Sequence, residues 1–226
     1  MSVARNTLVQ SSLTLGSRIL GMVRDILLIA KIGAGPIGDA WATAQQFPNL
    51  FRRIFAEGAF ASAFVPTYAR TLEAEGAEAA RDVAQEALRV LFAATAALTI
   101  LAQVFMPWVL LLIHGGQADD PESYGLAVLL TRITMPYLTF MAIAALLSGV
   151  LNSAERFILS AGAPTLLNLS LIPAAFVAPD AKGTALAAAL AYFVAGVLQA
   201  GALWWGVNRQ KVRLSLIGWP RMTPAV

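Results

Sequence analysis

Long runs of apolar residues, separated by short charged segments, make up most of this chain. Four runs contain no charged side chain, at residues 90–113, 133–151, 157–178 and 183–207. A helix of about 20 apolar residues is long enough to cross the hydrocarbon core of a bilayer. The pattern therefore predicts an all-α integral membrane protein.

The first 70 residues contain two further apolar stretches that are long enough to span but carry charges. The charged residues are Arg18, Arg24 and Asp25 in the first stretch and Arg52, Arg53 and Glu57 in the second. A signal peptide is a poor interpretation of the first stretch, because no small-residue cleavage site follows a clean apolar run. Amphipathic surface helices are the other alternative. We expect both stretches to span the membrane, which predicts six transmembrane helices, at residues 8–32, 40–68, 90–113, 125–151, 157–178 and 183–207.

The composition agrees with this class of protein. The chain is 58% hydrophobic and 13% charged, whereas an ordinary soluble domain is roughly 45–50% hydrophobic and about 25% charged. A soluble protein of this size needs more charged surface than this chain can supply.

Basic residues are distributed unevenly over the segments that connect the six predicted spans. If the N-terminus is cytoplasmic, nine basic residues lie inside and two lie outside. The nine are Arg5, Arg70, Arg81, Arg89, Arg156, Arg209, Lys211, Arg213 and Arg221, and the two are Lys31 and Lys182. The positive-inside rule then places both termini in the cytoplasm, with residues 208–226 as a basic cytoplasmic segment. The net charge of +3 reflects this topology, and we expect no nucleic-acid partner.

Few residues are suited to metal or nucleophilic chemistry. The chain has no cysteine and one histidine, His114, which we expect in a loop, so a soft-metal site or a nucleophile–histidine pair has almost no ligands. Residues 33–38 fit the G-x-G-x-x-G pattern of dinucleotide-binding proteins. That motif needs alternating strands and helices, and a tight turn between two membrane helices explains the glycines equally well. We expect no metal and no cofactor.

Charged residues in or beside the first two predicted spans carry the functional information. They are Arg18, Arg24, Asp25, Asp39, Arg52, Arg53 and Glu57. A basic side chain at the bilayer centre costs roughly 2.5–3.5 kcal/mol on insertion scales, so it usually faces a protein interior or a wet cavity. Arg53 and Glu57 are four residues apart and can pair along one helix face, and Arg18 and Asp25 are a second candidate pair. The remaining positive charge predicts an anionic ligand, and guanidinium groups suit phosphate oxygens.

Five short stretches of sequence are distinctive. They are residues 17–25 (SRILGMVRD), 47–60 (FPNLFRRIFAEGAF), 63–66 (AFVP), 149–152 (GVLN) and 163–168 (APTLLN). Together they resemble the MurJ/MviN family of lipid II flippases, and the second stretch is specific. The resemblance extends over nearly the whole chain.

This resemblance implies a fold, a function and a set of site residues. The family belongs to the MOP superfamily and has a fourteen-helix fold whose two lobes rock around a cationic cavity, and the six helices predicted here resemble the N-terminal lobe. Its members move lipid II, the undecaprenyl-pyrophosphate-linked peptidoglycan precursor, from the inner to the outer leaflet of the bacterial cytoplasmic (inner) membrane. The residues that match cavity arginines expected to hold the pyrophosphate are Arg18, Arg24 and Arg52. Those that match polar positions near the cavity or its gate are Ser17, Asp39 and Glu57.

Other interpretations stay open at this point. A related polysaccharide-lipid or drug exporter would not require this arginine set, and a non-transporting membrane fragment would require no ligand. An enzyme acting on the lipid pyrophosphate is disfavoured, because the sequence lacks a convincing catalytic constellation. The chain ends at Val226, before a second lobe, so we expect a fragment or a lobe that works with a separate second half, because rocking needs two bodies. The expected partners are lipid II, membrane lipids and the missing C-terminal lobe.

Overall fold

The computed structural model describes residues 3–55, 59–113, 121–154, 156–216 and 218, and all the regular secondary structure among these residues is α-helical. The helices are α1 (Val3–Ile32), α2 (Pro36–Phe55), α3 (Ala59–Ala74), α4 (Ala77–Ile113), α5 (Pro121–Thr134), α6 (Tyr137–Ser153), α7 (Phe157–Val177) and α8 (Ala181–Arg209). The chain is therefore all-α, as the apolar pattern predicts.

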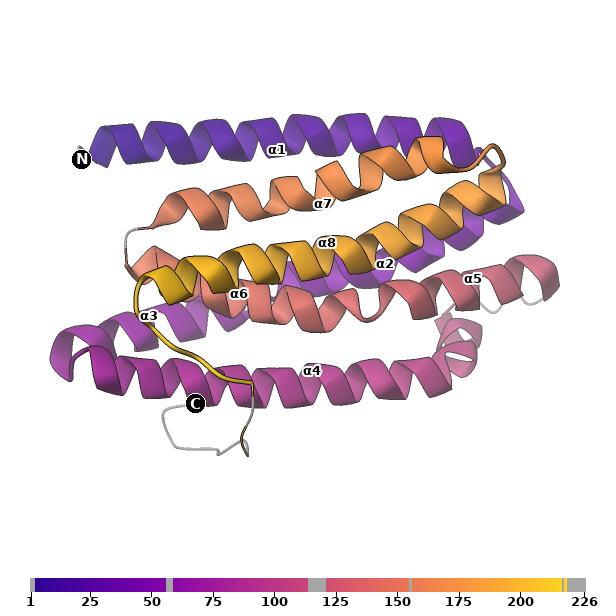
Figure 1. The fold of residues 1–226 in the computed structure, drawn as a ribbon. Helices are drawn as coiled ribbons and strands as arrows, with labels where there is room; N and C mark the ends of the chain where they lie inside the picture. The colour runs from indigo at the N-terminus through magenta and orange to yellow at the C-terminus, as the bar shows by residue number, and fades with distance from the viewer. Residues whose placement is uncertain (1–2, 56–58, 114–120, 155, 217, 219–226) are drawn as a thin grey trace.

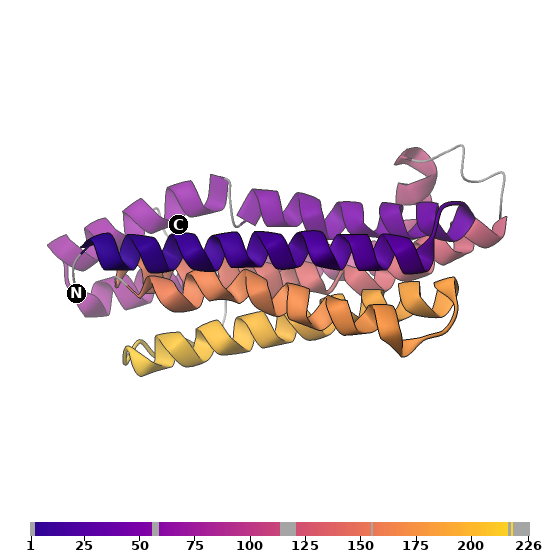
Figure 2. The same ribbon diagram turned by 90° about the horizontal axis from the view of Figure 1, so that it is seen from above.

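The helices run side by side and form one elongated bundle (Figures 1 and 2). Helix α1 lies along α7, which is distant in sequence, and α7 also packs against α8. Helix α2 packs against α5, and α6 contacts both α4 and α8. The start of α1, the end of α3, the start of α7 and the end of α8 lie at the same end of the bundle (Figure 1). The positive-inside rule predicts that these segments lie on the cytoplasmic side.

Among the described residues, four helical segments are long and apolar enough to cross a membrane, judged by length and composition. They are Ala77–Ile113, Pro121–Ser153, Phe157–Val177 and Ala181–Arg209. They correspond to the last four of the six predicted spans. The charged helices of the first 74 residues do not meet this criterion, so the count of six spans stays a prediction.

The second predicted span, residues 40–68, contains parts of two helices instead of one. Helix α2 begins at Pro36 and ends at Phe55, and α3 runs from Ala59 to Ala74. Arg52 and Arg53 therefore lie on α2, whereas residues 59–68 lie on a separate helix, α3.

The fourth predicted span, residues 125–151, is also divided. Helix α5 ends at Thr134 and α6 begins at Tyr137. Pro136 lies between them, and proline cannot donate the backbone hydrogen bond that a continuous helix needs. The two halves together still form one candidate span, Pro121–Ser153.

Small residues allow the helices around α8 to pack closely. Ala185, Ala188, Ala189 and Ala195 on α8 are fully buried. A Cβ atom added to Gly196 would lie 2.9 Å from Cβ of Phe140 on α6, so only glycine fits this contact without movement. Close approach through small side chains is a common way for membrane helices to associate.

The segment after α8 crosses the bundle and contacts α4. The backbone N–H of Ser215 donates to Oε1 of Gln85 over 2.7 Å, and the Gln85 amide group donates to the carbonyl of Ser215. The guanidinium of Arg81 donates to the carbonyl of Arg213 over 3.1 Å. Residues 213–215 are therefore attached to α4.

Candidate functional site

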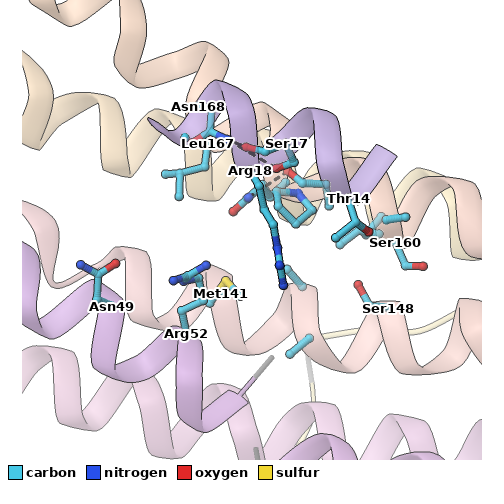
Figure 3. A pocket seen from close by; sticks show the side chains of 18 of the residues that line it. Thr14, Ser17, Arg18, Asn49, Arg52, Met141, Ser148, Ser160, Leu167 and Asn168 are labelled. Atoms are coloured by element: carbon cyan, nitrogen blue, oxygen red, sulfur yellow. Dashed lines mark hydrogen bonds between the residues drawn. The ribbon is translucent and has the colours of Figure 1, made fainter. Parts of the chain in front are cut away.

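A cavity of about 670 Å³ lies within the bundle (Figure 3). Its walls come mainly from α1, α6 and α7, with further residues from α2, α3 and α8. The charged side chains that line it are Arg18, Arg24 and Asp25 from α1 and Arg52 from α2. The uncharged polar ones are Thr14, Ser17, Asn49, Tyr137, Ser148, Asn152, Ser160, Asn168 and Gln199. The lining thus combines polar and apolar side chains, with an excess of positive charge.

Arg24 is held by partners on two helices. Its side chain is 15% exposed, and its Nη2 lies 2.7 Å from Oδ1 of Asp25, to which Nε also donates over 2.8 Å. Its Nη1 donates to Oδ1 of Asn168 on α7 over 2.9 Å. Asn168 in turn donates from Nδ2 to the carbonyl of Ser17 over 2.7 Å. Arg24, Asn168 and Ser17 therefore form one network that joins α1 to α7.

Arg18 and Arg52 approach the cavity from opposite walls. Arg18 extends from α1 into the space between α1 and α6, and Arg52 projects from α2 across from it (Figure 3). Both side chains are exposed to the cavity. Within the part of the chain that the structure describes, Arg18 has neither a hydrogen bond nor an ion pair. Its guanidinium can therefore turn toward an anion.

The candidate pair of Arg18 and Asp25 is wrong, because Asp25 pairs with Arg24. Seven residues of α-helix rise about 10 Å, which is too far for this contact, whereas the long side chain of Arg24 folds back onto its neighbour. The candidate pair of Arg53 and Glu57 stays a prediction, since Glu57 lies outside the described residues. Arg53 is exposed near the end of α2 and is absent from the cavity lining.

The other predicted site residues differ in position. Ser17 lines the cavity and accepts from Asn168. Asp39 is exposed in the first turn of α2 and is not part of the lining, so its role near the cavity or its gate stays a prediction. His114 also lies outside the described residues.

Several uncharged residues that line the cavity were not predicted as site residues, because only charges stand out in an apolar sequence. Asn168 lies in one of the distinctive stretches, but a lone asparagine in an apolar run does not reveal which helix it contacts. The spacing of Ser160, Pro164 and Asn168 places all three on one face of α7, and all three line the cavity. This four-residue spacing was the available indication.

The fold and the cavity define a multi-pass helical membrane protein with an internal cationic site. A family model described as lipid II flippase MurJ matches residues 29–221. A probable lipid II flippase MurJ of Rhizobium tropici is 41% identical over the whole of this chain, which corresponds to 43% of that relative. The lipid II flippase MurJ of Burkholderia cenocepacia is 40% identical over 88% of this chain and 39% of its own length.

A solved structure supports the same relationship. The lipid II flippase MurJ in an inward closed conformation superposes with a TM-score of 0.74 and 27% identity, over 92% of this chain and 44% of that one. The chain belongs to the MurJ family. It spans about two fifths of the length of the relatives that it matches, as its 43% coverage of two of them shows.

Proposed function

We propose that the chain forms the N-terminal lobe of a lipid II flippase, and that its arginines hold the pyrophosphate of the lipid-linked precursor. The observation that carries this proposal is the convergence of Arg18, Arg24 and Arg52 on one cavity. Three guanidinium groups and one carboxylate, that of Asp25, give the lining a net charge of +2. A diphosphate supplies the missing negative charge and accepts several charge-assisted hydrogen bonds.

The three arginines have different roles in this proposal. Arg24 is anchored by Asp25 and Asn168, so it provides a fixed charge at the wall between α1 and α7. Arg18 and Arg52 lie on opposite walls, so a diphosphate between them is bound from both sides. Guanidinium forks match the planar arrangement of phosphate oxygens better than ammonium groups do.

Translocation by this lobe requires a second body. In transporters that use alternating access, two repeats or bundles rock around a fixed site, and we propose that the second lobe of the flippase supplies a further wall of this cavity. The lipid tail stays in the bilayer, where membrane lipids surround it. The protein then acts as a transporter in the bacterial inner membrane, with both ends of this chain in the cytoplasm, and catalyses no covalent step.

The test replaces each of the three arginines by alanine in the protein expressed from its full gene. We expect each variant to insert into the membrane but to lose transport of the lipid precursor to the outer leaflet, and we expect lysine to restore it only in part. Arg70→Ala is the matched control, because Arg70 is exposed on α3 and outside the cavity lining. Well-inserted alanine variants that transport normally would assign these arginines a structural role.

A further inference from the structure

Pro48 removes a backbone hydrogen bond from α2 just before the cavity. In an α-helix the carbonyl of residue i accepts from the N–H of residue i+4, so Pro48 leaves the carbonyl of Ala44 without its helical donor. Ala44 and Pro48 are both buried. The neighbouring helix α5 offers a replacement donor, because Oγ1 of Thr134 lies 3.3 Å from the carbonyl oxygen of Ala44.

The hydroxyl of Thr134 has two acceptors within reach. It also lies 3.0 Å from the carbonyl of Thr131 in its own helix, and its single proton serves one acceptor at a time. The Thr131 carbonyl already accepts the N–H of Met135 over 2.9 Å. The bond to Ala44 therefore replaces a donor that the helix lacks, whereas the bond to Thr131 duplicates one that exists.

At the end of α5, which carries Thr134, a side chain of another helix likewise replaces a missing backbone donor. Pro136 leaves the carbonyl of Arg132 without its helical donor, and the Gln103 amide group on α4 donates to that carbonyl over 2.9 Å. The two carbonyls that lose their helical donors to Pro48 and Pro136 thus each accept a hydrogen bond from a polar side chain of another helix. Together these contacts join α4 to α5 and α5 to α2.

Residues of the cavity follow directly after the proline in α2. Asn49 and Arg52 lie within the turn that follows Pro48, and both line the cavity. A proline inside a helix is a common cause of a bend, so the direction of these two side chains depends on how α2 is held at Pro48. A contact that fixes this bend therefore also fixes how Arg52 enters the cavity.

We propose that Thr134 is a positioning residue for Arg52: its hydroxyl holds the Ala44 carbonyl, sets the bend of α2 and directs Asn49 and Arg52 into the cavity. Gln103 supports it by fixing the last turn of α5. The inference rests on the proposed function only for the identity of the anion that Arg52 binds.

The test measures the direction of α2 without any lipid substrate. The chain has no cysteine, so Asn49→Cys introduces its single thiol, and the rate of labelling by a membrane-impermeant charged maleimide reports exposure to the aqueous cavity. Thr134→Val should lower this rate roughly fivefold, the ratio that loss of one neutral hydrogen bond produces in a two-state equilibrium. Thr134→Ser keeps the hydroxyl and should label at nearly the original rate.

Thr131→Val is the matched control. Thr131 is equally buried on the same helix, and its hydroxyl donates within that helix, to the carbonyl of Ala127 over 2.7 Å. Its replacement should leave the labelling rate unchanged. Equal labelling of the Thr134→Val and unaltered proteins would overturn the proposal.

The same comparison in a Pro48→Ala protein keeps the test decisive if Thr134→Val alone folds poorly. Pro48→Ala restores the backbone donor to the Ala44 carbonyl, so Thr134→Val should have no further effect on labelling in that background. An effect of the same size with and without Pro48 would show that Thr134 acts through packing, and would overturn the proposal. Because no substrate is present, these outcomes are independent of whether the arginines bind pyrophosphate.

Discussion

Asn168 offers a sharp test of how the cavity holds charge. It is 4% exposed, accepts from Arg24 over 2.9 Å and donates to the carbonyl of Ser17 over 2.7 Å. Asn168→Leu preserves most of the volume but removes both contacts. The bond to the charged guanidinium is worth about 1.5–3 kcal/mol, and Arg24 keeps Asp25 as a partner, so we expect a destabilisation of about 2 kcal/mol.

Asn168→Asp separates this stabilisation from ligand binding. The carboxylate still accepts from Arg24, so the protein should remain more stable than Asn168→Leu. The net charge of the cavity lining falls from +2 to +1, because two carboxylates then face three arginines. A phosphate at about 6 Å from the new carboxylate, in an effective dielectric of about 20, is repelled by roughly 3 kcal/mol. We therefore expect anion binding about a hundredfold weaker.

Two measurements on the full protein in detergent check these expectations. Thermal unfolding should rank the unaltered protein and Asn168→Asp above Asn168→Leu, with the leucine variant lower by about 2 °C. Titration with inorganic pyrophosphate gives the affinities. If Asn168→Asp binds pyrophosphate as tightly as the unaltered protein, positive charge in this cavity is not what attracts the anion. If Asn168→Leu melts at the original temperature, the Arg24–Asn168–Ser17 network contributes nothing measurable to stability.

Two further predictions concern topology and the end of α2. A reporter fused after Val226 should read as cytoplasmic, as the distribution of basic residues predicts, and a periplasmic reading would refute that orientation. If Arg53 and Glu57 pair, the double variant Arg53→Glu with Glu57→Arg should retain more transport than either single charge loss. A double variant as inactive as the worse single one, at equal membrane levels, would argue for a direct role of these residues.

Helix positions were predictable where the apolar runs were uninterrupted. The predicted range 157–178 agrees with α7 (Phe157–Val177), and 183–207 lies within α8 (Ala181–Arg209). The boundaries inside the ranges 40–68 and 125–151 were not predicted. Helices bend at some prolines and end at others: Pro48 lies inside α2, whereas Pro136 separates α5 from α6. The local sequence does not distinguish the two outcomes, because neighbouring helices decide them.

The arginines of the cavity were predictable, but their partners were not. A charge in an apolar run is visible in the sequence, and its high insertion cost indicates an interior position. The partner of Arg24 on α7 is separated from it by 144 positions, so it depends on the packing of α1 against α7. Placing the uncharged side chains of Asn168 and Thr134 in the membrane has no comparable insertion cost. Their presence in an apolar helix therefore does not indicate a position at the cavity.

The attachment of residues 213–215 to α4 has a consequence for which substitutions the protein tolerates. Gln85 exchanges hydrogen bonds with the backbone of Ser215, and Arg81 contacts the backbone of Arg213. Side chains at 213 and 215 therefore do not form these bonds, and many residues can replace them without loss of the attachment. Position 85 has no such freedom, because only an amide side chain both donates and accepts in this geometry. Variation is permitted on one side of this contact and restricted on the other.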